Sequence, residues 1–221
     1  MSLNQSFQRW HTLATPLGAD LAPLLQVMAL NSSNSPELAS KIVETRLNEI
    51  ESEEDKVLFL TRVREAVLKG MLLSGVPRVI NTLSHISGVV DPSLMEKLPK
   101  ESTKKITSME DFARIHARGD SFFDKVYGSQ ATKVREVLRG YNPDLMDFVQ
   151  DSYGRYLSDE RLLSSVETEL CVIAALVPMG VEPQLKSHCI GAMNVGATKE
   201  QVETVLSLAK AVLQDVQERR Q

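Results

Sequence analysis

The chain has 221 residues, and its 25 basic and 29 acidic side chains give a formal net charge of −4. This balance argues against an overall attraction to nucleic acid or to an anionic membrane, and we expect neither as a partner. Apolar residues make up 43% of the chain, and only two residues are cysteines. Such a composition is typical of an ordinary globular protein in a reducing compartment.

Targeting signals are weak along the whole chain. No apolar run approaches the roughly 18 residues that a membrane-spanning helix needs. The first 20 residues lack the basic-then-apolar order of a secretory signal. The final residues, Glu218-Arg219-Arg220-Gln221, differ from a peroxisomal tripeptide. We therefore expect a cytoplasmic protein, with an organelle such as the mitochondrion or the peroxisome as the alternative.

The first part of the chain, residues 1–87, is predicted to be helical. Apolar residues at helical spacing predict a helix over 19–30 and another that opens at Pro36. Ser52 and the acids after it predict a helix start, followed by a helix to about residue 73 and a shorter one over 77–86. Residues 88–110 contain several prolines and polar residues, which predict a linker with little regular structure.

The second part, residues 111–221, contains a helix-start signal before nearly every predicted helix. A Ser, Thr or Asn followed by acidic or amide residues is typical of an N-cap, and two of these signals are full capping boxes. Glycines stand where the preceding helices are expected to end. The predicted starts are Ser108, Asn142, Ser164, Pro183 and Thr198, and the predicted ends are Gly128, Gly140, Gly180 and Gly196.

A faint internal repeat links the two parts. The segment Pro36-Glu-Leu-Ala-Ser40 matches Pro183-Gln-Leu-Lys-Ser187, and each follows an apolar helix. Two diverged copies of one helical hairpin unit would explain the match. We therefore predict an all-α fold with a degenerate N-terminal repeat at 1–87, a linker at 88–110 and a second repeat at 111–221.

His188 is the most informative histidine because of its helical neighbours. Residues three, four and seven positions away share its face. One interpretation is a core histidine that bonds a backbone carbonyl, and the other is a site residue with free space beside it. The neighbours are mostly apolar or small: Val181, Gln184, Leu185, Gly191, Ala192 and Val195.

Glu169 is a carboxylate on an apolar stripe, which is costly to bury unless it is paired. Glu167 already serves the capping box at Ser164, so Glu169 has no capping role. Two explanations remain open, a structural ion pair and a partner for an imidazole. If the two helices pack antiparallel through the turn at 178–183, Glu169 and His188 can meet.

Other site chemistry has little support in the sequence. Glycine-rich phosphate loops, zinc-protease motifs and CxxC pairs do not occur, so we predict neither a cofactor nor a metal site. Cys189 adjoins His188, but adjacent helical residues point about 100° apart. Cys171 and Cys189 are therefore weak candidates for a nucleophile or a redox centre.

The second part resembles the carboxymuconolactone decarboxylase and alkyl hydroperoxidase D superfamily. The stretches that carry this resemblance are NPDLMDFVQDSYGRYLS, VETELCVIAAL and EPQLKSHCIGAMNVGATKEQV, together with Arg118-Gly119 and Val126-Tyr127-Gly128. The resemblance implies an alkyl hydroperoxidase D-like helical fold, symmetric oligomers and a site made from Glu169 and His188. Ala22 and about Lys41 stand at the corresponding positions of the first copy, so one site per chain is expected.

The resemblance also separates two branches of the superfamily. The peroxidase branch carries two cysteines at positions that are Val181 and Gln184 here, so thiol peroxidase chemistry is the third choice. The first choice is a cofactor-free acid–base lyase or isomerase acting on a small carboxylated or lactone substrate. The second is a non-catalytic oligomeric or regulatory protein. We predict a homo-oligomer, a dimer or trimer, partly because the apolar stripe over Val202–Val216 is broad.

Overall fold

The computed structural model describes residues 2–221, which form helices and contain no strand. This result confirms the predicted all-α fold. The helices are α1 (Leu3–Ala14), η1 (Thr15–Leu17), α2 (Gly18–Ser32), α3 (Pro36–Glu49), α4 (Glu53–Ser74), α5 (Val76–Val89), α6 (Pro92–Lys97), α7 (Met109–Tyr127), η2 (Gly128–Gln130), α8 (Ala131–Tyr141), α9 (Pro143–Ser152), η3 (Tyr153–Leu157), α10 (Ser165–Met179), α11 (Glu182–Asn194) and α12 (Lys199–Arg219).

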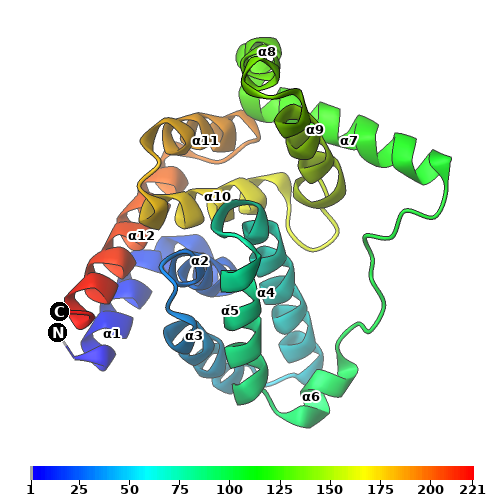
Figure 1. Cartoon of the computed structure of the whole chain (residues 1–221). Helices are drawn as coiled ribbons and strands as arrows, with labels where there is room; N and C mark the ends of the chain where they lie inside the picture. The colour runs from blue at the N-terminus through cyan, green and yellow to red at the C-terminus, as the bar shows by residue number, and fades with distance from the viewer. Residues whose placement is uncertain (1) are drawn as a thin grey trace.

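Helix α10 lies at the centre of the molecule, between α11 on one side and α2 and α4 on the other (Figure 1). Its residues from Thr168 to Val177 are all buried, as expected for a helix that is apolar on every face. Helices α2 and α4 come from the first part of the chain and α12 from the end, yet all of them contact α10. The apolar core is therefore shared by both parts of the chain.

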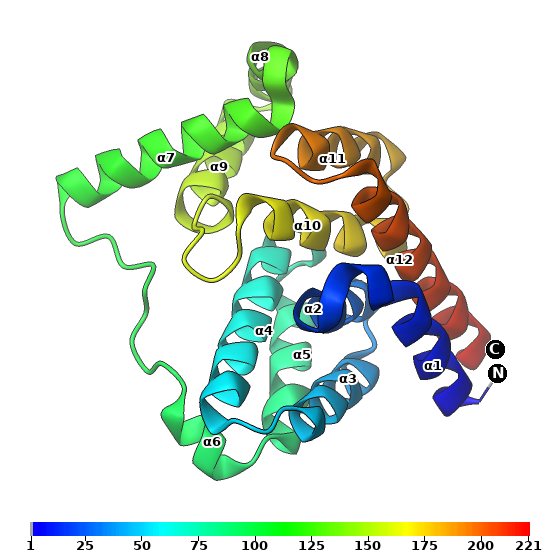
Figure 2. The ribbon, with the colours of Figure 1, turned by 180° about the vertical axis from the view of Figure 1, so that it is seen from behind.

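The two ends of the chain meet where α1 packs against α12, as both overall views show (Figures 1 and 2). Trp10 Nε1 donates to Asp215 Oδ2 at 2.9 Å in this contact, and Arg9 pairs with Asp215 at 3.0 Å. The apolar stripe over Val202–Val216 is covered by α1, α2 and α10. Its breadth is therefore explained within one chain, and the homo-oligomer stays a prediction without this support.

Within residues 2–221, one segment is a candidate membrane-spanning helix. Leu3–Ser32, which comprises α1, η1 and α2, is long and apolar enough to cross a bilayer by length and composition. However, 61% of its apolar window is buried inside the protein. A buried core helix such as α2 passes the same test, so this stretch is explained by the core.

The region predicted as a linker has more regular structure than expected. Helix α5 continues to Val89, and α6 follows at once because Asp91 accepts a hydrogen bond from the Ser93 N–H and Pro92 occupies the first turn. Apart from Val90 and Asp91, which join these two helices, the stretch from Leu98 to Ser108 is free of helix, and it runs along the edge of the molecule to α7 (Figure 1).

Two buried lysines attach α4 and this stretch to the second part of the chain. Lys69 Nζ donates to the carbonyls of Leu157 and Asp159 at 3.2 and 2.8 Å and to the Thr168 hydroxyl at 2.7 Å. Lys104 Nζ pairs with both Glu65 and Asp159 at 2.7 Å. These contacts hold the loop before α10 in place, and α10 carries Glu169.

Helices α7 and η3 approach each other with no side chain between them. A Cβ on Gly119 would lie 2.5 Å from the Cα of Gly154, so both positions require glycine. Residues Tyr153–Leu157 form a π-helical turn at this crossing. Such turns are rare insertions into helices and occur often at functional sites. This one directs Tyr153 toward α7 and Tyr127.

Candidate active site

Glu169 lies in the second turn of α10. The Ser164 side chain accepts from the Glu167 N–H, and the Glu167 carboxylate accepts from the Ser164 N–H, so the predicted capping box is present. Glu167 also pairs with Arg62 at the protein edge. Glu169 has no such role and is 0% exposed. It is therefore a carboxylate inside the core that needs a partner from another helix.

His188 provides that partner from α11. Pro183 stands in the first turn of α11, after the left-handed glycine Gly180 that ends α10. The resulting antiparallel hairpin places His188 Nδ1 at 2.8 Å from Glu169 Oε2. His188 is 8% exposed, so the bond is shielded from water. The contact that the hairpin geometry allowed is therefore present.

The space expected beside His188, next to Gly191, is occupied by Glu169 and Val126. A Cβ on Gly191 would lie 3.1 Å from Glu169 Oε2 and 2.7 Å from a methyl carbon of Val126 on α7. Ala192 is likewise fully buried. The expectation that Gly191 leaves room for a ligand was wrong, because the missing side chain lets α7 and Glu169 approach α11.

An aromatic wall closes one side of the pair, and the sequence did not single it out. The Tyr127 ring lies edge-on to the His188 ring, with 6.1 Å between their centroids. The Tyr153 hydroxyl donates to the Tyr127 hydroxyl at 3.4 Å. Burial raises the pKa of both phenols, so both stay neutral near pH 7. The available signal was that Tyr127 and Tyr153 both stand in stretches that carry the family resemblance.

Two polar atoms of the pair have no protein partner among residues 2–221. Glu169 Oε1 is buried and makes no hydrogen bond. His188 Nε2 makes none either, since only Nδ1 of this ring is bonded. When Glu169 is ionised it can only accept, so Nδ1 then donates the bond and Nε2 of a neutral ring presents a lone pair. Such an atom can take a proton from a reacting group and return it.

The cysteines are poorly placed for thiol chemistry. Burial raises the pKa of Cys171 to about 12, and burial also raises the pKa of Cys189. A thiol with a raised pKa is a weak nucleophile because the thiolate is the reactive form. Val181 and Gln184 occupy the positions where the peroxidase branch has cysteines. Among residues 2–221, no cluster of three His, Cys, Asp or Glu side chains could hold a metal ion.

An acidic substrate would need cations, and three stand near the pair in sequence: Lys186, Lys199 and Arg155. Lys186 is exposed, and Lys199 is exposed beside Glu203 at 3.5 Å. Arg155 lies on η3 and lines a separate apolar pocket of about 570 Å³, which neither Glu169 nor His188 lines. No hydrogen bond or ion pair within residues 2–221 joins any of these three cations to His188.

Comparison with known proteins assigns the second part of the chain to a family. Residues 143–219, from α9 to α12, match the carboxymuconolactone decarboxylase family, and this span includes Glu169 and His188. Peroxisomal protein 2 of Schizosaccharomyces pombe is 31% identical over 210 residues, which is 95% of this chain and 92% of that protein. The chain belongs to the carboxymuconolactone decarboxylase family.

A second relative of this chain is Peroxisomal protein 2 of Saccharomyces cerevisiae. It is 31% identical over 172 residues, which cover 69% of this chain and 61% of that protein. The match to the first relative extends over nearly the whole chain, so it includes the N-terminal helices that lie outside residues 143–219.

Proposed function

We propose that this carboxymuconolactone decarboxylase family member is a cofactor-free lyase or isomerase that moves a proton with His188. The observation that carries the proposal is the 2.8 Å bond from His188 Nδ1 to buried Glu169, which leaves Nε2 unbonded. Glu169 orients the ring and stabilises its charged form. General acid–base help of this kind contributes about 10² to 10⁴ in rate.

The family name suggests the first substrate to test, a carboxylated lactone. In a decarboxylation, the bond to the carboxyl carbon breaks, carbon dioxide leaves, and the electron pair remains on an enolate. The Nε2 lone pair would first take a proton from water, and the charged ring would then give that proton to the enolate carbon and become neutral again. The hydroxide left behind would combine with carbon dioxide as bicarbonate. Tyr127, whose ring centroid lies 6.1 Å from that of His188, would supply a neutral hydroxyl as the donor for the enolate oxygen.

The experiment combines a chemical assay with a readout of the pair. We expect His188→Gln to lower decarboxylation of carboxymuconolactone by about 10²-fold or more. Nitrogen NMR of wild-type His188 should show the neutral ring protonated at Nδ1, and Glu169→Gln should weaken that preference. His85→Gln and Glu182→Gln are the matched controls. They make the same substitutions at exposed positions, His85 on α5 and Glu182 on α11.

Two results would contradict this proposal. Equal turnover in wild type and His188→Gln would remove the proton-transfer role. An unchanged ring tautomer in Glu169→Gln would remove the positioning role of the carboxylate.

A second candidate is a non-catalytic member of the family, and the 8% exposure of His188 favours it. In that case the pair is a structural ion pair, and Glu169→Gln and His188→Gln should lower only stability. Wild-type chain without turnover on carboxymuconolactone or related lactones, together with a large loss of stability in both variants, would support this reading.

We also infer a peroxisomal location, which the names of the two relatives support. The test is the position of a fluorescent fusion in yeast cells that carry a peroxisomal marker. A diffuse cytoplasmic signal would contradict the inference.

A further inference from the structure

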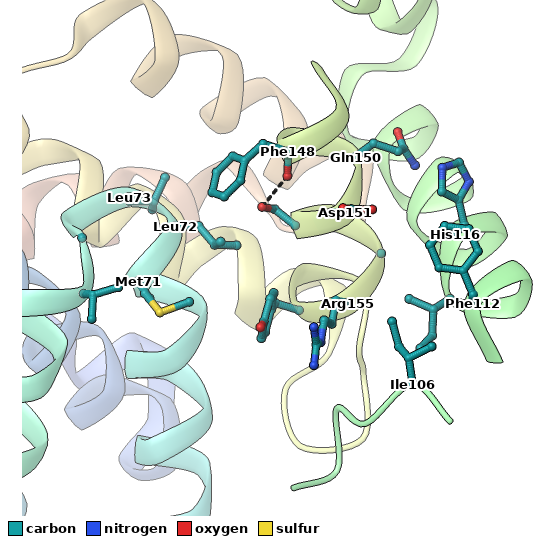
Figure 3. Close-up of a pocket in the computed structure, with 16 residues that line it drawn as sticks. Met71, Leu72, Leu73, Ile106, Phe112, His116, Phe148, Gln150, Asp151 and Arg155 are labelled. Atoms are coloured by element: carbon teal, nitrogen blue, oxygen red, sulfur yellow. Dashed lines mark hydrogen bonds between the residues drawn. The ribbon is translucent and has the colours of Figure 1, made fainter. Parts of the chain in front are cut away.

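An apolar pocket of about 570 Å³ lies between α4, α7, α9 and η3, and His188 is not among the residues that line it (Figure 3). One wall is the end of α4 with Met71 to Leu73, and the facing wall is α7 with Phe112 and His116 (Figure 3). Helix α9 and η3 supply the floor, including Gln150 and Arg155. The volume falls in the range of about 300–1,000 Å³ that is usual for small-molecule sites.

A buried amide in this pocket lacks a partner. Gln150 is 7% exposed, and its Nε2 atom makes no hydrogen bond with residues 2–221. No bond joins its Oε1 either, so exchanging the two amide atoms would not satisfy the group. A buried amide without a partner costs about 1–3 kcal/mol, and a polar ligand atom would recover this.

A half-buried cation in the same pocket lacks an acidic partner. Arg155 Nε donates to the Lys104 carbonyl at 3.0 Å, which fixes the side chain. None of the ion pairs within residues 2–221 includes Arg155. The other basic side chain in the pocket, His116, already has Asp120 as a neighbour, at 3.3 Å from its Nδ1. Asp151 is exposed on the pocket wall and would repel a second negative charge.

We propose that this pocket binds a small amphipathic monocarboxylate. The walls from α4, α7 and Phe148 would cover its apolar body, Arg155 would pair with the carboxylate, and Gln150 would donate to a ligand oxygen. A single negative charge fits because one unpaired cation is present and burying an unpaired charge is costly. The inference is independent of the proton-transfer role of His188, since the two sites share no residue.

The test is calorimetric titration of the full chain with octanoate, and with octanol as the uncharged probe of equal length. We expect one octanoate per chain. Arg155→Gln should weaken octanoate binding about tenfold or more, because a charged hydrogen bond contributes roughly 1.5–3 kcal/mol. The same change should leave octanol binding within about twofold, since octanol has no charge to pair.

Two further variants separate the pocket from general effects. Leu72→Trp should fill the pocket and abolish octanoate binding, and Leu58→Trp, at an exposed position of the same helix, should not. Gln150→Leu should weaken octanoate binding about tenfold or more, because one hydrogen bond to the charged carboxylate is lost. Exposed Gln217→Leu should have no effect. Thermal melts show which variants are folded. If Leu72→Trp does not fold, the comparison of octanoate with octanol in Arg155→Gln still tests the proposal.

Three results would overturn the proposal. The first is no octanoate binding at low-millimolar concentration. The second is an equal loss of octanoate and octanol affinity in a folded Arg155→Gln variant, which would show that Arg155 does not pair with the carboxylate. The third is a dimer in light scattering that Phe148→Asp dissociates, because the pocket would then be an interface between two copies.

Discussion

Gly191 is the residue on which the closeness of the Glu169–His188 pair depends. Its missing side chain admits both Val126 and Glu169 Oε2 to the surface of α11. Gly140 on α8 offers a contrast, because a Cβ there would meet nothing within 4 Å. Gly140 was predicted to end its helix, but α8 continues through Tyr141 and ends at the Asn142 cap.

We therefore expect opposite effects of alanine at these two glycines. Gly140→Ala should raise the free energy of unfolding by up to about 1 kcal/mol, because alanine is the better helix former. Gly191→Ala gains the same helix-propensity stabilisation, but overpacking costs about 1–3 kcal/mol. We therefore expect a net loss of unfolding free energy and a changed His188 NMR signal. Urea unfolding measures both, and a stabilised Gly191→Ala would show that Val126 and Glu169 yield easily.

Lys69 is a buried cation whose charge is linked to pH. Burial, as the largest cause, lowers its pKa from 10.5 to about 8 in the folded protein. Between pH 8 and 10.5 the unfolded chain therefore binds more protons than the folded one, so the Lys69 contribution makes stability rise with pH. Cys171 opposes this above pH 9, because burial raises its pKa to about 12 and the folded chain keeps that proton.

The comparison of wild type with Lys69→Met isolates the contribution of the lysine to the pH dependence of stability. The difference in unfolding free energy should be flat below pH 8 and should then rise in favour of wild type. The slope approaches about 1.4 kcal/mol per pH unit for one proton. Lys41→Met is the control because Lys41 is exposed on α3. A difference that stays flat to pH 10 would show that Lys69 keeps its proton throughout.

The contacts of the Glu169–His188 pair show which side chains can be predicted from sequence and which cannot. The spacing about the turn at 178–183 was enough to bring Glu169 to His188, because an antiparallel hairpin sets which turns face each other. Tyr127 and Tyr153 reach the pair from α7 and η3, and their position depends on the close crossing of Gly119 and Gly154. That crossing joins segments distant in sequence, so no local pattern reports it.

At the scale of elements, the caps carried most of the predictive information. Ser52, Ser108, Asn142, Ser164 and Thr198 each accept a backbone N–H at the predicted helix start. Side-chain capping is a local interaction within three residues, which is why it is visible in sequence.

Two helices were missed for different reasons. Helix α1 begins with a capping box at Ser2 and Gln5, but only Ser6, Trp10 and Ala14 are buried on it, which is too sparse a stripe to detect. Helix α6 has six residues and was hidden by the prolines around it. The π-turn η3 could not be predicted, because the glycine crossing that accompanies it is a tertiary contact.

At the scale of the whole molecule, the two predicted parts are joined rather than separate. Helix α10 packs on α2 and α4, α12 packs on α1 and α2, and Lys69 crosses from α4 to the loop before α10. The division at residues 88–110 remains a proposal about ancestry, together with the repeat. We infer from the shared core that the chain unfolds as one unit.

Trp10, the only tryptophan, makes this inference testable because it lies where α1 meets α12. Urea unfolding followed by Trp10 fluorescence should coincide with unfolding followed by far-ultraviolet circular dichroism, which reports every helix. Asp215→Ala removes the buried acceptor of Trp10 and Arg9, so both transitions should shift together by about 1.5–3 kcal/mol. Exposed Asp147→Ala should shift neither. If the fluorescence transition moved while most of the dichroism stayed, the ends would open separately, and the remaining helices would form an independent unit.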